Sequence, residues 1–375
     1  MNRRLIKSTL IALLAGTGLL VSLTAANFST NLSYNPAFQS GSRATAAAHV
    51  ITVGHKHKKS KPVVVKPLIW SAAQGIDPAG DIGAVSCSSP SFCVAVDAVG
   101  NSLTWNGKRW ALTQGLEPPS NDGDSLTAVS CVSATRAAPA VISHKKHHKK
   151  SLPGQFCMVG DSAGNALMGN RYKWSTLSSV DSSGSGLMSI SCASDKFCAA
   201  VDNIGSALTW NGTTWSALQP VVPSSDSLDS ISCLAANYCL AVDMDGNAYI
   251  WNGSTWSAPL AVDPNNGGNF EASCASENFC AAVDQNGDAL TWNGSAWSAP
   301  LVLETSGAGF ASISCALTQF CVAVDNEGNE LTYSGGKWSS IHTIDPSGAF
   351  AAVSCVSAMF CVAANNVGGV LVGRS

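Results

Sequence analysis

The chain has 375 residues, 46% hydrophobic and only 12% charged, which is unusually apolar for a soluble protein and leaves ample material for a large core. The net charge is −3, but the basic and acidic residues are distributed unevenly along the chain. Residues 1–66 hold nine basic residues and no acid, residues 136–153 hold five, and the remainder holds seven against all 24 acids, about −17 in net charge. Six of the seven histidines lie in the basic segments, which argues against a Ser-His-Asp or Cys-His catalytic site in the body.

The N-terminus is typical of an export signal. Arg3, Arg4 and Lys7 precede an uncharged, leucine-rich run over 8–26, which ends in the small residues Thr24-Ala25-Ala26. Residues 1–26 are therefore predicted to be a signal peptide. The run of 19 residues is close to the ~20 needed for a membrane span, so an uncleaved anchor is the alternative. Either way, we expect an extracellular or cell-surface protein.

A basic linker follows. Residues 27–66 are rich in Ser, Ala, Thr and Lys without periodicity, which is typical of a disordered arm. Its lysines, Lys56, Lys58, Lys59 and Lys61, are predicted to bind a surface polyanion. Nucleic acid is an unsuitable partner for an exported protein, so an anionic wall polymer, lipid headgroup or polysaccharide is expected.

Residues 67–375 consist of seven copies of a unit of about 41 residues, each with one pair of cysteines. An even number of cysteines at a fixed spacing predicts local disulfides in an oxidising compartment. A zinc site is the weaker interpretation, because no histidine accompanies the pairs. No cofactor or metal is expected. The pairs are Cys87/Cys93, Cys131/Cys157, Cys192/Cys198, Cys233/Cys239, Cys274/Cys280, Cys315/Cys321 and Cys355/Cys361.

Each unit divides into four short strands with an Asp-x-x-Gly turn after the second and an Asn-Gly turn after the third, as in residues 190–215. Four strands per unit predict an all-β fold, a seven-bladed β-propeller. The seventh unit ends after its third strand, whereas Leu68-Ile69-Trp70-Ser71 stands before the first unit and matches a fourth strand. We therefore expect the N-terminal strand to complete the last blade and close the ring.

The second unit carries an insertion in its first hairpin, residues 136–153, with a His/Lys run that includes Lys145, Lys146, Lys149 and Lys150. These lysines are predicted to bind polyanions as well, and the histidines offer possible metal ligands. The first and third hairpin connections of a blade lie on one face, so both basic segments should leave from that face. The Asp-x-x-Gly turns and the linkers between blades should form the other.

Two recurring residue types are candidates for binding. The turn aspartates are expected to cap their own turns, or alternatively to form an acidic ring that binds a ligand; they are Asp97, Asp161, Asp202, Asp243, Asp284 and Asp325. The tryptophans of the third and fourth strands are expected to pack between blades, or alternatively to stack on sugars.

The repeated pattern Val-Asp-x-x-Gly-x-x-Leu-Thr-Trp-Asn-Gly-x-x-Trp resembles the repeat of tectonin-type propeller lectins and, more loosely, the Asp-box of sialidases. The resemblance covers residues 67–375 and implies a propeller. The tectonin likeness further implies glycan binding by loops between blades. The sialidase likeness implies an arginine cluster that the body, with Arg109, Arg171 and Arg374, does not supply.

The sequence thus predicts a secreted or surface-tethered propeller that binds without catalysing a reaction, with glycan or a surface polymer as its partner. The alternatives are a purely structural or adhesion scaffold with a protein ligand, and an extracellular polysaccharide hydrolase or lyase. The last would need two carboxylates about 5–10 Å apart over the channel.

Overall fold

The computed structural model describes residues 66–375 except 79, 114, 117–124, 135–153, 223–225 and 264–267, together with one short strand pair nearer the N-terminus. The chain forms two units, Met1–Ser60 and Lys61–Ser375. In the first, β1 (Leu10–Ile11) pairs with β2 (Ser22–Leu23). The predicted leader, the linker up to residue 65 and the inserted loop otherwise lie outside the described residues, as do the eight lysines predicted to bind polyanions. Within the described residues, no helix is long and apolar enough to cross a membrane.

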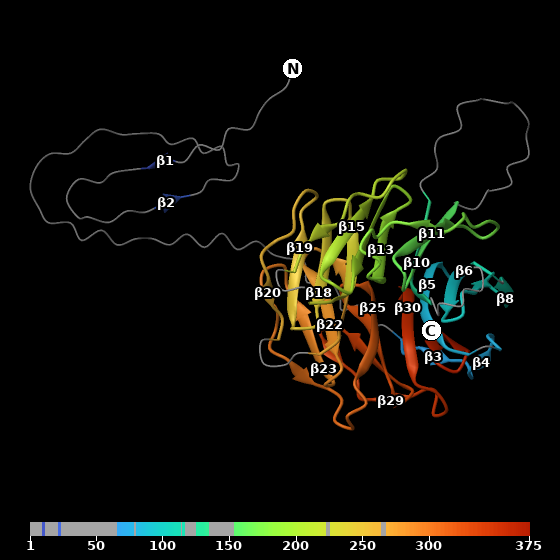
Figure 1. Ribbon diagram of the computed structural model, residues 1–375. Helices are drawn as coiled ribbons and strands as arrows, with labels where there is room; N and C mark the ends of the chain where they lie inside the picture. Colours follow the sequence, from blue (N-terminus) through green and yellow to red (C-terminus); the bar gives the residue numbers. More distant parts are fainter. Residues whose placement is uncertain are drawn as a thin grey trace, which may run out of the picture. The chain divides into compact units, whose positions relative to one another are not determined.

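The second unit is all-β and consists of seven antiparallel sheets, here called blades 1 to 7, each with four strand positions (Figure 1). The first strands are β5 (Ile82–Ser89), β9 (Leu126–Ser133), β13 (Leu187–Ser194), β17 (Leu228–Ala235), β21 (Phe270–Ser276), β25 (Phe310–Leu317) and β30 (Phe350–Ser357). The second strands are β6 (Phe92–Asp97), β10 (Gln155–Asp161), β14 (Phe197–Asp202), β18 (Tyr238–Asp243), β22 (Phe279–Asp284), β26 (Phe320–Asp325) and β31 (Phe360–Asn365).

The outer half of each blade is less regular. The third strands are β7 (Ser102–Trp105), β11 (Asn165–Gly169), β15 (Ser206–Trp210), β19 (Asn247–Trp251), β23 (Asp288–Trp292), β27 (Asn329–Ser334) and β32 (Gly369–Arg374). The fourth positions hold β8 (Trp110–Thr113), β12 (Ser178–Ser179), β16 (Gln219–Pro220), β20 (Leu260–Ala261), β24 (Leu301–Val302), β28 (Lys337–Trp338) with β29 (His342–Thr343), and β3 (Ile69–Trp70) with β4 (Gln74–Gly75).

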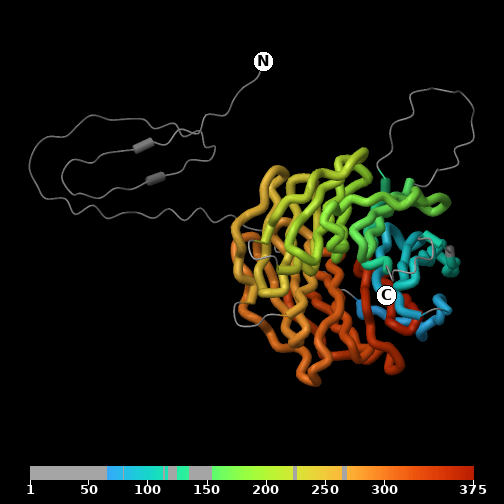
Figure 2. Tube along the Cα trace, in the orientation of Figure 1, coloured from blue at the N-terminus to red at the C-terminus, as the bar shows by residue number. Residues whose placement is uncertain are grey.

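The ring closes through the N-terminal strand, as the sequence predicted. Ile69 lies opposite Arg374 and Trp70 opposite Gly373, so β3 is the fourth strand of blade 7. The first strands contact one another around the ring, and β30 of blade 7 contacts β5 of blade 1. Figures 1 and 2 show β3 and β4, in lighter blue, beside the red C-terminal strands. Closure gives every blade a packed neighbour on both sides, so no blade has a sheet face left uncovered as at the ends of an open array.

A ring of serine side chains ties the seven first strands together. The Oγ of the serine before the first cysteine accepts the backbone N–H of the corresponding cysteine in the next blade, at 2.8–3.0 Å. The seven pairs are Ser86–Cys131, Ser130–Cys192, Ser191–Cys233, Ser232–Cys274, Ser273–Cys315, Ser314–Cys355 and Ser354–Cys87. The recurring Ser-Cys dipeptide therefore has a structural role. Its serine hydroxyl accepts a backbone N–H of the next blade, which would otherwise lack an acceptor.

We expect Ser232→Ala to lower the free energy of unfolding by about 1–2 kcal/mol, because the amide of Cys274 loses its acceptor inside the ring. Urea unfolding monitored by tryptophan fluorescence would measure this loss. Ser254→Ala is the matched control, since the Ser254 hydroxyl makes an exposed contact with Asn252 and its removal should change stability by less than about 0.5 kcal/mol. Equal effects of the two substitutions would contradict a structural role for the ring.

All seven predicted disulfides are formed, which confirms the pairing that the cysteine spacing indicated. Each joins directly opposed residues of the first and second strands of one blade. The bonds are Cys87–Cys93, Cys131–Cys157, Cys192–Cys198, Cys233–Cys239, Cys274–Cys280, Cys315–Cys321 and Cys355–Cys361. Disulfides of this number are typical of proteins in oxidising compartments outside the cytosol.

The cysteines serve the fold and form no surface site for a ligand. The second cysteine of every pair lies in the middle of its blade, where the neighbouring blades cover it, and is 0% exposed. These seven residues are Cys93, Cys157, Cys198, Cys239, Cys280, Cys321 and Cys361. Because both sulfurs of each pair are bonded to one another, none is a thiolate that could bind a metal.

The tryptophans pack between blades, which confirms the first of the two expectations for them. Trp105 and Trp110 of blade 1 belong to a cluster with Val362 and Val370 of blade 7. Trp251 and Trp256 of blade 4 pack in the same way on Phe197 of blade 3. In four blades the third-strand and fourth-strand rings lie 5.6–6.0 Å apart between centroids. Stacking on sugars by the partly exposed fourth-strand rings stays a prediction.

Candidate binding face

The two ends of the blades form faces of different composition. Connections between first and second strands and between third and fourth strands lie at one end, here called the hairpin face. Turns between second and third strands, with the linkers between blades, lie at the other, here called the Asp-turn face. Lys66 and Pro67 precede β3 at the hairpin face, and the backbone N–H of Ala134 donates to the oxygen of Gly154 across the base of the blade 2 insertion, at the same face.

The six predicted aspartates all lie in turns of the Asp-turn face and are 0–1% exposed. Asp97 shows the arrangement: Oδ1 accepts the N–H groups of Val99 and Asn101, and Oδ2 accepts the side-chain amide of Asn101. Each of the other five carboxylates accepts the corresponding two backbone N–H groups, and in blade 7 the side-chain oxygen of Asn365 does so. Turn capping thus occupies these groups; direct ligand binding by them stays a prediction.

The glycine of each turn is required by geometry. Gly328 has a φ of +82°, and a Cβ there would lie 1.7 Å from the backbone oxygen of Asp345 in the linker to the next blade. The carbonyl of the same glycine accepts the N–H groups of Ile344 and Asp345. The Asp-x-x-Gly turn is therefore the point at which each linker is fastened to its own blade.

A second set of acids, which the sequence patterns above did not single out, lies in these linkers. Asp345 shows the pattern: it follows an apolar residue, its N–H bonds to the turn glycine of the same blade, and its side chain is buried. The set consists of Asp77, Asp181, Asp263, Glu304 and Asp345. The signal in the sequence is an apolar-acidic pair at the end of most units, such as Val262-Asp263 or Leu303-Glu304, whereas blade 3 has Val222-Pro223 there.

Some of these linker acids reach the turn of the following blade. Asp345 Oδ2 accepts the side-chain amide of Asn365 at 2.7 Å. Burial raises the pKa of Asp202, and the nearby Asp181 raises it further. Burial would also raise the pKa of Asp181, but hydrogen bonds from Ser183 and Ser185 outweigh this and lower its pKa below the ordinary value.

The inner strands of blades 4 and 5 hold two carboxyl groups that no prediction included. Burial raises the pKa of Asp229 to about 6, although Ser227 and the backbone N–H of Phe270 donate to it. Burial raises the pKa of Glu271 to about 8, and Asp229 raises it further. The protonated form of each group is therefore favoured well above the pH at which an ordinary carboxyl ionises.

The surface of the Asp-turn face combines apolar and acidic residues. Val99 and Val367 are each 61% exposed in the turns of blades 1 and 7, and Ile204 and Met244 are exposed in blades 3 and 4. Asp245 is exposed in the turn of blade 4, and the neighbouring Asp226 raises its pKa. Exposed apolar groups with polar or charged residues around them are typical of protein-binding surfaces.

The basic residues lie elsewhere. Every described Lys or Arg belongs to the hairpin face, in a hairpin connection or at the adjoining strand end: Lys66, Lys108, Arg109, Arg171, Lys173, Lys196, Lys337 and Arg374. Arg171 is held there by a hydrogen bond to the backbone oxygen of Ser91 and by the ring of Phe92. The described part of the propeller thus has one acidic face and one basic face.

The chain matches no protein-family model and no curated protein. Solved structures similar to it are propellers. YCF48 bound to D1 peptide has a TM-score of 0.61 at 13% identity, covering 82% of this chain and 97% of that one. The WD40 β-propeller domain of Doa1 has a TM-score of 0.60 at 12% identity, covering 82% and 97%. YCF48 from Cyanidioschyzon merolae has a TM-score of 0.60 at 12% identity, covering 81% and 98%.

At these identities the similarity establishes the class of protein by its fold: a seven-bladed β-propeller, as predicted, with one disulfide in each blade. This fold is compatible with a binding scaffold that performs no catalysis. The likeness to tectonin-type and Asp-box repeats stays an expectation.

Proposed function

We propose that this protein is an exported, non-catalytic binding propeller whose Asp-turn face binds a protein segment with basic and apolar side chains. The observation that carries the proposal is the separation of charge: all described Lys and Arg side chains belong to the hairpin face, whereas exposed Val99, Val367, Ile204 and Met244 share the other face with acids such as Asp245. A structurally similar propeller, YCF48, is bound to a peptide, which supports this use of the fold.

The basic segments complete this proposal. Lys66 and the base of the blade 2 insertion both lie at the hairpin face. Lysine runs that start there would hold that face against an anionic wall polymer, glycan or lipid surface. The acidic face would then point away from the surface, toward its ligand. If the leader is retained, it would add a membrane tether.

We expect a synthetic peptide of alternating lysine and leucine to bind the full-length protein, and Val99→Asn with Val367→Asn to weaken binding about tenfold. Both substitutions remove exposed apolar surface from adjacent blades without adding charge. Fluorescence anisotropy at low and high salt would measure binding, which should weaken with salt because the face is acidic.

Met359→Asn is the matched control, because Met359 is 65% exposed but lies in the first hairpin of blade 7, on the hairpin face. It should leave the affinity unchanged. Equal binding of a glutamate-leucine peptide, or equal loss in the control variant, would contradict binding at the Asp-turn face.

Glycan recognition is the second candidate function, and a groove between blades 2 and 3 favours it. The groove has a volume of about 490 Å³ and is lined by Trp215 and by the hydroxyl-bearing residues Ser175, Thr176, Thr213 and Thr214. A partly exposed aromatic ring beside several hydroxyl groups is a combination suited to sugars. Retention of the full-length protein on soluble wall glycans tests this candidate.

Polysaccharide hydrolysis is less well supported. Asp229 and Glu271 are two carboxyls on neighbouring inner strands, but the pKa values of both are raised, whereas a glycosidase needs one protonated carboxyl beside one ionised carboxylate. In addition, Asp229 is only 9% exposed, and its oxygens accept hydrogen bonds from Ser227 and Phe270. Its surroundings therefore fit a structural carboxyl better than a catalytic one.

A further inference from the structure

The residue after the turn glycine has a defined task in most blades. In blades 1, 2, 4 and 6 it is an asparagine, whose side-chain amide donates to Oδ2 of the turn aspartate at 2.7–3.0 Å. In Asp325, for example, the two backbone N–H groups occupy Oδ1 and the amide of Asn329 occupies Oδ2. The buried carboxylate is thereby satisfied at both oxygens, as a buried charge requires.

Blade 5 breaks this pattern by exchanging the donor for an acceptor. Asp288 stands where those four blades have asparagine, so a second carboxylate takes the place of the amide. Oδ1 of Asp284 still accepts the N–H groups of Asn286 and Asp288 at 2.9 Å. Oδ2 of Asp284, a fully buried residue, has no hydrogen-bond partner among the described residues.

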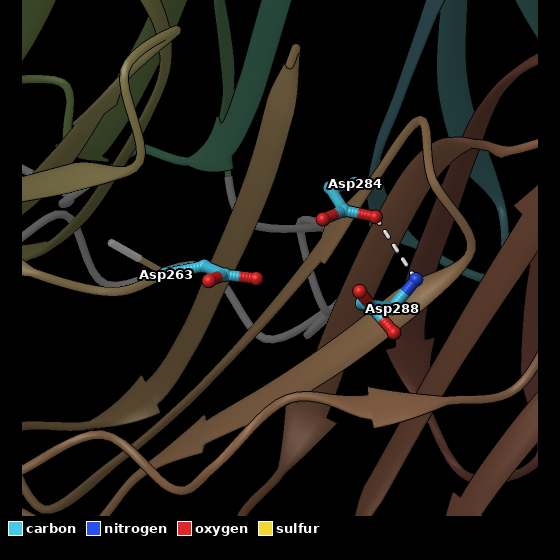
Figure 3. Close-up of side chains that lie close together, drawn as sticks. All are labelled: Asp263, Asp284 and Asp288. Atoms are coloured by element: carbon cyan, nitrogen blue, oxygen red, sulfur yellow. Dashed lines mark hydrogen bonds between the residues drawn. The ribbon is translucent and has the colours of Figure 1, made fainter. Parts of the chain in front are cut away.

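A third carboxylate completes the group. Asp263, the linker acid at the end of blade 4, reaches the turn of blade 5, so that one oxygen from each of Asp263, Asp284 and Asp288 lies within 4.8 Å of the others. All three residues are buried, with exposed fractions of 2%, 0% and 7%. Figure 3 shows the three carboxylates turned toward a common space between the linker and the turn.

Two other junctions between blades are built differently. At the junction of blades 6 and 7, Asn365 replaces the turn aspartate and donates to Asp345. At the junction of blades 2 and 3 there are two carboxylates, and hydroxyls of Ser183 and Ser185 donate to Asp181.

Three carboxylates this close together and this deeply buried repel one another unless a cation or protons neutralise their charge. In blade 5, burial raises the pKa of Asp284, and Asp288 and Asp263 raise it further. A bound cation would remove that repulsion and would occupy the unpartnered Oδ2 of Asp284.

We propose that Asp263, Asp284 and Asp288 bind a divalent cation, with Ca²⁺ as the preferred ion. Hard carboxylate oxygens are the ligands that Ca²⁺ takes, and it accepts backbone oxygens and water for its remaining positions. The histidine-rich segments offer imidazole, which suits zinc, copper or nickel instead. The cation would join the linker of blade 4 to the turn of blade 5, where other blades use an asparagine amide. The sequence alone predicted no metal.

The test compares the full-length, oxidised protein in EDTA and in millimolar Ca²⁺. We expect one Ca²⁺ per chain by equilibrium dialysis and a rise in the melting temperature of about 5 °C on saturation, because a ligand that binds only the folded state stabilises it. Asp288→Asn should bind no Ca²⁺ at this site and lose the temperature response. In EDTA it should melt at or above the wild-type temperature, because the new amide can donate to Asp284 Oδ2 as Asn329 does to Asp325.

Asp245→Asn is the matched control, since it removes an exposed acid from the neighbouring turn of blade 4. It should retain the stoichiometry and the temperature response of the wild type. Mg²⁺ should substitute poorly, because it demands a tighter octahedral shell. If the wild type binds no Ca²⁺, or if Asp288→Asn binds it as well as the wild type does, the three carboxylates are held by protons and the proposal is wrong.

Discussion

Glu271→Gln is expected to raise the free energy of unfolding by about 4 kcal/mol at pH 8 and to leave it nearly unchanged at pH 4. Glu271 lies in the inner strand β21, at the position that Ser230 holds in blade 4 and Ser312 holds in blade 6. Burial raises its pKa from 4.5 to about 8. The ionised form is therefore disfavoured in the folded protein relative to the unfolded chain.

The sign of the pH dependence follows from that shift. Below pH 4.5 the carboxyl is protonated in both the folded and the unfolded chain, and it costs nothing. Between pH 4.5 and 8 the unfolded chain releases the proton while the folded chain keeps it, so stability falls by about 1.4 kcal/mol per pH unit. Above pH 8 the loss is complete. Asp229, with its pKa raised to about 6, changes stability in the same direction over a narrower range.

The measurement is urea unfolding of the wild type and Glu271→Gln at several values between about pH 4 and pH 8.5, a range that spans both pKa values. The difference between the two proteins isolates Glu271, because all other titrating groups are shared. Glu277→Gln, in the exposed first hairpin of the same blade, is the control and should give only a small difference. A difference for Glu271→Gln that stays constant with pH would show that the carboxyl is not desolvated.

The fold was predictable because its signals recur seven times. The cysteine spacing, the Asp-x-x-Gly turn and the unmatched strand around Trp70 each constrain the same ring, and the pairing of Trp70 with Gly373 confirms its closure. Turn capping was predictable as well, since it depends on a few consecutive residues. These patterns are local, and the repeat shows each of them several times.

The candidate cation site and the buried Glu271 were harder to predict from the sequence, because both depend on departures from the repeat. Blade 5 lacks the bulge that separates Leu228 from Ser230 in blade 4, so its first strand is one residue shorter and brings Glu271 into a serine position. The proximity of Asp263 to Asp284 likewise depends on how one blade's linker meets the next blade's turn. Such contacts cross unit boundaries, and no single repeat reveals them.

Reduction of all seven disulfides is expected to unfold the propeller in native buffer. Six of the loops close over a separation of six residues, worth about 2 kcal/mol each in chain entropy, and the Cys131–Cys157 loop closes over 26, worth about 3.5 kcal/mol. The loops are separate along the chain, so their effects should be close to additive, about 16 kcal/mol in total. This exceeds the ~5–15 kcal/mol typical of folded proteins.

Reduction should also be slow until the structure opens, because the second cysteine of each pair is fully buried. We expect the rate of thiol release to rise steeply with urea, and far-UV circular dichroism to lose its β signal together with it; the protein kept in urea without reductant is the control. Replacing Cys131 and Cys157 by alanine should cost about 1.5 kcal/mol more than replacing Cys233 and Cys239, since the first pair closes the longer loop. A fully reduced chain that still unfolds cooperatively would show instead that closure and packing between blades suffice without the sulfur bridges.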